Sequence, residues 1–230
     1  MENITIKEFV KNDGKMSYAL PVKSGEIVFV IAPHPDDETI GCGGAILKMI
    51  RQHIDVRILL LTDGGNGVRP HEDAEVRERE FERAMEVLGI KHIYRFGFKD
   101  GKLAESYILM RNELENYIKK DRPRLIFAPY IFDFNKDHQC AVKALIELRK
   151  IMISTDIMMY EVWTPILYPD YYINITEEYQ NKKMAMQCYE SQDIYYNIVE
   201  KAEALNRFRS TLSAYKKSSY MESFRRIHDN

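Results

Sequence analysis

A dense group of ionisable side chains occupies residues 33–38, which read PHPDDE. An imidazole nitrogen and carboxylate oxygens are common ligands of zinc, at distances of about 2.0–2.2 Å. We therefore expect His34 and Asp37 to bind a metal ion, while Pro33 and Pro35 stiffen the turn that directs their side chains.

A catalytic metal ion of this kind needs a third protein ligand and an open position for water. The sequence NKDH at residues 135–138 follows a predicted strand at 125–128 and begins a predicted helix. His138 lies on the same helical stripe as Val142 and Leu145, so its ring should point inward. If the strand order is 3-2-1-4-5, the first and fourth strands are neighbours and the loops after them face one crevice. This topology would bring His138 to His34.

Each of these residues also has a purely structural interpretation. Asp37 and Asp137 are residue types that commonly cap helices, and His138 could be a hydrogen-bonded residue at a helix start. The stretch GCGG at residues 41–44 could cradle a phosphate, but it lacks the GxGxxG and Walker patterns. Its glycines favour close packing of a helix against a sheet.

The elements that must position these side chains follow an alternating pattern. Apolar strands are predicted at 27–31, 56–61, 93–96, 125–128 and 158–161, with helices between them at 45–50, 73–88, 104–120 and 138–153. The clearest strands are apolar throughout rather than at every second residue, which is typical of a parallel sheet covered on both faces. The pattern predicts an α/β three-layer sandwich with a mostly parallel central sheet.

The C-terminal part of the chain departs from this alternation. Residues 168–175 are predicted as an edge strand, and residues 177–189 and 195–212 as helices. Residues 216–230 show little apolar periodicity, which predicts a mobile tail. We expect a single domain over residues 1–230, with a core at about 25–165 and the C-terminal strand and helices at 166–215.

Composition excludes several classes of protein. The chain has 230 residues and a formal net charge of -2, so it offers no basic field for nucleic acid. Its three cysteines are widely spaced and form no CxxC pair, which favours a reducing, cytoplasmic setting over a disulfide framework. The N-terminus lacks the apolar run of a signal peptide, and the longest apolar stretches are too short for a transmembrane segment.

Residues 32–38, followed by residues 41–44, closely resemble the signature of the LmbE-like (PIG-L) deacetylase family. The resemblance extends from about residue 27 to residue 192. Individually weaker matches follow in order: residues 62–64, Arg77 with Glu80, Ala84, residues 88–89, residues 100–103, residues 137–138, residues 161–163 and residues 191–192.

This resemblance implies a Rossmann-like fold and one zinc ion per chain, held by His34, Asp37 and His138. It also implies that Asp36 is the general base in the hydrolysis of an N-acyl group, often an N-acetyl group on an N-acetylglucosamine conjugate. The expected partner is thus a small amino-sugar or glycoconjugate substrate. Affinity order alone does not select the metal, so another divalent transition metal, such as iron or cobalt, stays open.

One position departs from the family pattern. Many relatives have His where this chain has Asn135, and that His is thought to help stabilise the oxyanion. An Asn amide can donate a neutral hydrogen bond but cannot carry a positive charge. Asn135 is therefore either an oxyanion donor or only a turn and cap residue.

Three further residues have two interpretations each. Arg77 lies on the apolar stripe of its helix, where it either binds a substrate hydroxyl or anion or forms a buried pair with Glu80 or Asp63. Asp100 either hydrogen-bonds a sugar hydroxyl or is a solvated turn residue. Trp163, with the tyrosines at 168, 171 and 172, forms either an aromatic wall for a sugar ring or part of the core.

Other functions compete with the amino-sugar deacetylase. One alternative is an amidase that acts on a thiol conjugate or an antibiotic precursor, and another is a metal- or nucleotide-binding module without catalysis. The sequence leaves open a homo-oligomer, and it assigns no role to Glu161 or to Ser191 and Gln192.

Overall fold

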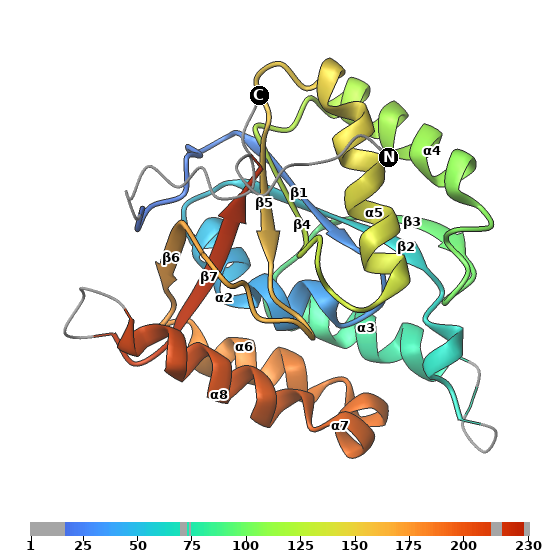
Figure 1. Cartoon of the computed structure of the whole chain (residues 1–230). Helices are drawn as coiled ribbons and strands as arrows, with labels where there is room; N and C mark the ends of the chain where they lie inside the picture. Colours follow the sequence, from blue (N-terminus) through green and yellow to red (C-terminus); the bar gives the residue numbers. More distant parts are fainter. Residues whose placement is uncertain (1–16, 70–72, 74, 213–217, 228–230) are drawn as a thin grey trace.

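The computed structural model describes residues 17–69, 73, 75–212 and 218–227, and a mixed seven-stranded sheet lies at its centre (Figure 1). The strand order is β3-β2-β1-β4-β5-β7-β6. The strands are β1 (Ile27–Ala32), β2 (Asp55–Thr62), β3 (His92–Phe98), β4 (Leu125–Pro129), β5 (Asp156–Tyr160), β6 (Tyr171–Asn174) and β7 (Met221–Arg226). The first five strands are parallel, so the predicted order 3-2-1-4-5 is confirmed.

Helices cover both faces of this sheet, which makes the fold a three-layer α/β sandwich, as predicted (Figure 1). The helix α2 (Asp37–Arg51) packs on one face with α3 (Val76–Leu88), α6 (Tyr179–Gln187) and α8 (Ile198–Thr211). The opposite face carries α4 (Tyr107–Asp121) and α5 (Lys136–Glu147). The remaining elements are α7 (Glu190–Tyr196) and the short 3-10 turns η1 (Gly65–Gly67) and η2 (Leu148–Ile151).

The apolar character of β1 explains why the sheet is covered on both sides. Val28 and Val30 belong to the core under α2 and α3, whereas Phe29 and Ile31 belong to the core under α4 and α5. Successive side chains of a strand point to opposite faces, so a strand between two helical layers must be apolar at every position. Within the described residues, none of the helices combines the length and the apolarity that crossing a bilayer requires.

The predicted mobile tail over residues 216–230 is wrong for its central part. Residues 221–226 form β7, an antiparallel strand that lies between β5 and β6. Its sequence, MESFRR, shows no apolar alternation because buried polar residues such as Glu222, Ser223 and Arg225 find partners in the fold. The tail residues 216–217 and 228–230 lie outside the described residues.

The predicted helix at 195–212 is divided into two helices, α7 and α8, at Asn197, whose φ is 48°.

The helix that follows the ionisable turn is kinked, and β7 holds its second half. Cys42 has non-helical backbone angles (φ -145°, ψ 20°), so the helical hydrogen bonding is interrupted there. The carboxylate of Glu222 accepts hydrogen bonds of 2.8 Å from the backbone N–H groups of Gly44 and Ala45. Glu222 thus provides, from a distant strand, the acceptor that a capping residue would otherwise supply.

A buried lysine completes this contact. The ammonium of Lys182 on α6 lies 2.7 Å from a Glu222 carboxylate oxygen and donates to the carbonyl of Ile40 (2.8 Å) and to Asn206 Oδ1 (2.9 Å). Lys182 and Glu222 have side-chain exposures of 0% and 1%, so water does not solvate either charge and each compensates the other. This cluster connects α6, α8 and β7 to the helix that carries Asp37.

Glycines let α2 approach its neighbours closely. A Cβ atom at Gly41 would lie 2.1 Å from Tyr160 Cδ2 on β5, and one at Gly44 would lie 2.6 Å from Ile175 Cγ2. Such contacts are far inside van der Waals distance. These glycines therefore serve helix-to-sheet packing, which is the role that the sequence favoured over a phosphate cradle.

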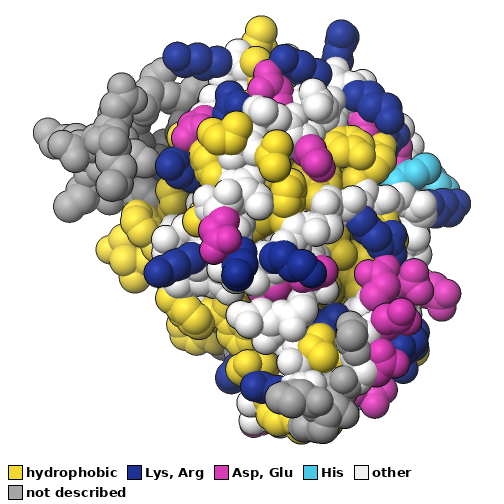
Figure 2. All heavy atoms as spheres, turned by 90° about the vertical axis from the view of Figure 1, so that its right-hand side faces the viewer, with side chains coloured by type: hydrophobic (Ala, Val, Ile, Leu, Met, Phe, Trp, Pro, Cys, Tyr) yellow, Lys and Arg dark blue, Asp and Glu magenta, His cyan; other side chains and the backbone are white. Residues whose placement is uncertain are grey.

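Charged side chains of both signs share the surface. On the face seen in Figure 2, Lys and Arg side chains are interspersed with Asp and Glu rather than gathered into one basic area. This arrangement agrees with the near-neutral formal charge of -2.

Glu222→Gln should destabilise the fold by about 3–5 kcal/mol, because it leaves the Lys182 ammonium buried without a counter-charge. The measurement is urea unfolding followed by far-ultraviolet circular dichroism. Glu75→Gln is the matched control, since the Glu75 side chain is 83% exposed. Equal unfolding free energies for the two variants would show that the buried pair contributes nothing.

Candidate functional site

The ionisable side chains converge at the carboxyl ends of β1 and β4. His34 lies in the turn between β1 and α2, Asp37 is the first residue of α2, and His138 lies in the first turn of α5. His138 Nε2 is 3.1 Å from Asp37 Oδ2 and 3.3 Å from His34 Nδ1. Residues more than a hundred positions apart in the sequence thus meet, as the strand order predicts.

These three residues fit a metal ion. One ligand atom from each of His34, Asp37 and His138 lies within 4.8 Å of the others. The second carboxylate oxygen of Asp37, Oδ1, is buried and has no hydrogen-bond partner among the described residues. A buried anionic oxygen beside two imidazole nitrogens is costly unless a cation or protons neutralise it, and a divalent cation would satisfy all three groups.

A second group of possible ligands, His34 with Asp100 and Asp137, is less suitable. The carboxylate of Asp137 already accepts hydrogen bonds from the backbone N–H groups of Gly101 (2.8 Å) and Leu103 (3.2 Å). Asp100 Oδ2 accepts one from Asn66 N at 3.1 Å. Since these carboxylate oxygens already accept hydrogen bonds, the structure favours the ligand group of His34, Asp37 and His138, in which one oxygen of Asp37 has no partner among the described residues.

Carboxylates also face the far nitrogen of each imidazole. His34 Nε2 lies 3.1 Å from Asp100 Oδ1 and 3.4 Å from Asp137 Oδ2. His138 Nδ1 lies 3.5 Å from Asp133 Oδ1. Metal-binding histidines are commonly oriented by such carboxylates, which fix the ring and make the ligating nitrogen more basic.

The pKa values of the three residues reflect this proximity. Burial lowers the pKa of His138, but the charge of Asp37, the carboxylate of Asp133 near Nδ1 and the contact of Nε2 with Asp37 raise it to about 9. Burial likewise opposes the protonation of His34, and hydrogen bonds to Asp100, Asp137 and Asp37 outweigh it, so its pKa is raised well above the usual value. Burial raises the pKa of Asp37, but the neighbouring imidazoles more than compensate and hold it well below its usual range. Without a metal ion, protons bind where a cation would bind.

Asp36 has a backbone conformation that is rare for a residue with a side chain. Its φ is 127° and its ψ is -30°, in a region where non-glycine residues are strained. Burial raises the pKa of Asp36 to about 7, although Arg77 lowers it. Strain of this kind is often retained where a side chain must point into a functional site.

Neighbouring groups hold the strained turn. Glu38 accepts hydrogen bonds from Asp36 N (3.3 Å) and from the hydroxyl groups of Thr39 (2.5 Å) and Tyr189 (2.7 Å). Arg77 Nη2 donates to Asp36 Oδ2 at 3.2 Å and also to the carbonyl of Pro35. Glu38 is therefore an anchor of the loop.

The predicted partners of Arg77 were wrong. Arg77 pairs with Asp36, whereas Glu80 accepts hydrogen bonds from Ser191 N and Ser191 Oγ, both at 2.7 Å. Arg77 on α3 can reach the turn after β1 because α3 packs beside the helix that follows this turn, α2. The apolar periodicity of α3 does not reveal this neighbour. Two of its guanidinium nitrogens, Nε and Nη1, are buried without a hydrogen-bond partner among the described residues, and Arg77 lines the pocket described below.

The solvated-turn interpretation of Asp100 was also wrong, because its side chain is only 13% exposed and contacts His34.

Glu161 has a structural role, because its carboxylate connects three segments of the chain. It pairs with Arg209 on α8 and accepts hydrogen bonds from Ile166 N and Ser223 Oγ, both at 2.7 Å.

Asn135 caps α5 and borders the site at the same time. Its Oδ1 accepts a hydrogen bond of 2.8 Å from Asp137 N, which is the geometry of a helix N-cap. Within the part of the chain that the structure describes, no group accepts a hydrogen bond from its Nδ2, and the residue lines the pocket. The cap uses the oxygen and leaves the amide nitrogen available, so the two sequence interpretations are compatible.

An open pocket of about 600 Å³ connects these residues. Such a volume lies within the usual range of about 300–1,000 Å³ for small-molecule sites. It is lined by His34, Asp36, Asp37, Asn66, Gly67, Arg77, Asp100, Phe134, Asn135, Val162, Trp163, Pro165, Gln192, Tyr196, Lys201 and Leu205. Trp163 therefore borders the pocket, but its aromatic neighbours are Phe134 and Tyr196 rather than the predicted tyrosines at 168, 171 and 172.

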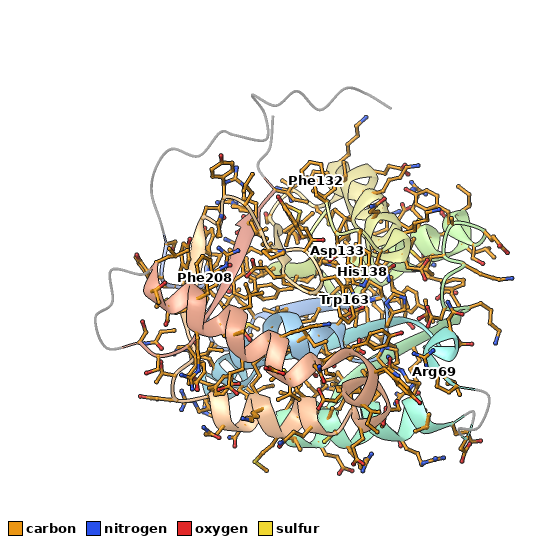
Figure 3. All side chains as sticks on the ribbon, turned by 60° about the horizontal axis from the view of Figure 1, so that its bottom comes forward. Arg69, Phe132, Asp133, His138, Trp163 and Phe208 are labelled. Carbon is orange, nitrogen blue, oxygen red and sulfur yellow. The ribbon has the colours of Figure 1, made fainter. Side chains whose placement is uncertain are left out.

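Asp133 is a site residue that the sequence analysis missed. It is fully buried between β4 and α5, and Figure 3 shows it near His138 and Trp163. Its Oδ1 faces His138 Nδ1 and accepts a hydrogen bond from Asn135 N at 3.0 Å. Its Oδ2 accepts hydrogen bonds of 3.1 Å from the backbone N–H groups of Trp163 and Thr164. The only sequence signal was an aspartate five residues before a candidate histidine ligand, which is weak by itself.

Comparisons with known proteins identify relatives of this chain. Residues 29–148 match the family model PIG-L, described as GlcNAc-PI de-N-acetylase. The chain is 31% identical over 193 residues to a diacetylchitobiose deacetylase from Thermococcus kodakarensis, covering 75% of this chain and 72% of the relative.

Solved structures show the same fold. The N,N'-diacetylchitobiose deacetylase from Pyrococcus horikoshii, complexed with an inhibitor, has a TM-score of 0.72 and 25% identity, covering 87% of this chain and 83% of its own. A conserved protein from Thermus thermophilus has a TM-score of 0.74 and 28% identity, with coverages of 86% and 93%.

Asp133→Asn should weaken zinc binding about 10- to 100-fold, because the carboxylate that faces His138 Nδ1 is lost. The measurement is competition for zinc with a fluorescent chelator. Asp193→Asn serves as the control, since Asp193 also accepts a backbone hydrogen bond, from Val199 N, but lies outside the pocket. Zinc affinity equal to that of the unmodified chain would show that Asp133 does not support the ligand.

Proposed function

Since the chain belongs to the PIG-L family of deacetylases, we propose that it removes the acetyl group from the nitrogen of an amino-sugar substrate with the help of a zinc ion. The observation that carries this proposal is the convergence of His34, Asp37 and His138, with the strained Asp36 beside them. Three protein ligands, of which His34 and Asp37 line an open pocket, fit the needs of a catalytic zinc site.

The ligand set supports zinc in particular. Two imidazoles and one carboxylate are typical of catalytic zinc, whereas magnesium and calcium prefer oxygen ligands alone. When bound, the cation polarises a water molecule and the amide carbonyl and stabilises negative charge on oxygen. Iron and cobalt accept the same ligands, so metal analysis decides among the three.

Asp36 acts as the general base and then as the general acid. Its carboxylate takes a proton from the attacking water as the new bond from oxygen to the acetyl carbon forms. The same proton then passes to the nitrogen as the bond between carbon and nitrogen breaks, which leaves acetate and a free amine. The hydrogen bond from Arg77 Nη2, at 3.2 Å, holds the Asp36 carboxylate in position.

The remaining polar residues stabilise and orient the substrate. Asn135 directs its free amide N–H group toward the oxyanion that forms at the acetyl carbon. Arg77 and Asp100, which both line the pocket, bind sugar hydroxyl groups. The second candidate, an amidase that acts on another acylated amine, uses the same chemistry, and the names of the relatives favour the amino sugar.

We propose a cytoplasmic setting, which the three free cysteines support.

Asp36→Asn should retain zinc and lower kcat by about 10²- to 10⁴-fold, because an amide cannot accept the proton from water. The measurements are metal content by mass spectrometry and acetate release from N,N'-diacetylchitobiose. Chelation of the unmodified enzyme should abolish acetate release, and added zinc should restore it. Full activity of the variant would disprove the base assignment, and activity that survives chelation would disprove the metal assignment.

Asn135→Asp separates the two roles of Asn135. Asp is as good an N-cap as Asn, so the unfolding free energy should change by less than about 0.5 kcal/mol. The donor is lost and a negative charge is added, so kcat should fall by at least about 10²-fold. The measurements are urea unfolding and acetate release. Unchanged kcat with unchanged stability would mean that Asn135 is a cap alone.

A further inference from the structure

Three aromatic side chains from separate segments meet at the mouth of the pocket. Phe134 precedes α5, Trp163 follows β5, and Tyr196 ends α7. The ring centroids of Phe134 and Trp163 are 6.3 Å apart, and those of Trp163 and Tyr196 are 5.8 Å apart. All three residues line the same pocket as His34 and Asp36. We call this group the aromatic rim.

The aromatic rim is not part of the hydrophobic core. Phe134 is 71% exposed and Tyr196 is 38% exposed, while Trp163 is partly buried. A continuous group of exposed aromatic rings beside a pocket is more informative than a single exposed apolar residue. Exposed rings of this kind commonly mark a surface that a ligand covers.

The position of Trp163 is fixed relative to the metal ligands. Asp133 Oδ2 accepts hydrogen bonds of 3.1 Å from Trp163 N and Thr164 N, and the same carboxylate faces His138. Figure 3 shows Trp163 beside this connection. Because one fully buried side chain holds both segments, the distance between the aromatic rim and the reacting centre is set by the fold.

Cations border the aromatic rim. The Lys201 ammonium lies 5.6 Å from the centre of the Trp163 ring, and the Arg69 guanidinium lies over Tyr195 and donates to the Tyr196 hydroxyl at 3.2 Å. Apolar ring faces with hydrogen-bond donors at their edge suit a sugar ring, which has C–H groups on its faces and hydroxyl groups around its perimeter.

We propose that the aromatic rim is a second sugar subsite, which stacks the pyranose ring attached to the residue that loses its acetyl group. This inference rests on the proposed deacetylase function. The subsite is continuous with the pocket that contains His34, Asp36 and Asp37, so both rings of a disaccharide occupy one cavity of about 600 Å³. The enzyme therefore prefers a disaccharide or a longer glycoconjugate to a free monosaccharide.

The second ring also contributes to the rate. Contacts made far from the reacting bond can position the substrate, and enzymes use such energy to raise kcat as well as to lower KM. Stacking on Trp163 would orient the acetamido group toward Asp36.

A binding test is available without catalysis, because Trp163 is the only tryptophan in the sequence. The Asp36→Asn protein, loaded with zinc, is titrated with N,N'-diacetylchitobiose and with N-acetylglucosamine while tryptophan emission is recorded. The disaccharide should change the emission at about tenfold lower concentration than the monosaccharide, the effect of about 1.4 kcal/mol. Equal responses, or none with the disaccharide, would overturn the subsite.

A kinetic test uses the ratio of kcat/KM for the disaccharide to that for the monosaccharide. Trp163→Ala should lower this ratio about tenfold, which corresponds to about 1.4 kcal/mol of lost discrimination. Trp163→Phe, which keeps a flat ring, should recover most of the ratio. Phe208→Ala is the control, because Phe208 on α8 is 54% exposed and lies away from the pocket (Figure 3), and it should leave the ratio unchanged.

The outcomes separate this proposal from the deacetylase function. An unmodified enzyme that releases acetate from neither sugar would refute the function, and the emission titration would then decide the subsite alone. A Trp163→Ala enzyme with an unchanged ratio would refute the subsite and leave the function intact. A change of oligomeric state in that variant, detected by sedimentation velocity, together with an unchanged ratio, would identify the aromatic rim as a protein interface and overturn the proposal.

Discussion

The carboxylate of Asp37 is buried between the imidazoles of His34 and His138, and one of its oxygens has no partner among the described residues. Burying a charge in this way costs free energy unless a cation or protons compensate for it. The fold meets this constraint by placing the turn after β1 next to the start of α5, at the point where neighbouring strands lead to loops on one edge. The strain at Asp36, the pairing of Arg77 and the carboxylates behind each imidazole all follow from packing ionisable groups around that position.

The helix that begins at Asp37 depends on the C-terminal part of the chain. Its kink at Cys42 breaks the helical hydrogen bonding, and Glu222 of β7 supplies acceptors for Gly44 N and Ala45 N. Lys182 neutralises Glu222 and binds the carbonyl of Ile40 in the first half of the helix. The site at the start of α2 is therefore supported by residues that are distant in sequence and make no contribution to its chemistry.

Short-range pattern and strand order were enough to predict part of this arrangement. The apolar strands and the position of His138 after the fourth strand predicted that His34, Asp37 and His138 would meet. The sequence did not predict β7, because its buried residues Glu222, Ser223 and Arg225 are polar and only the folded chain supplies their partners. It did not predict Asp133 for a related reason: the carboxylate binds backbone N–H groups and one imidazole, and neither kind of contact leaves a sequence pattern.

Asp133 also shows how this site can keep its chemistry while its substrate changes. The carboxylate accepts hydrogen bonds from the backbone N–H groups of residues 135, 163 and 164, so these three contacts do not depend on which side chains stand at those positions. The side chains at 134 and 163 can therefore vary without moving His138. A fixed reacting centre with variable rings at its mouth is the arrangement expected of a fold that applies one hydrolytic reaction to many acylated sugars, because loops change more readily than the scaffold that carries them.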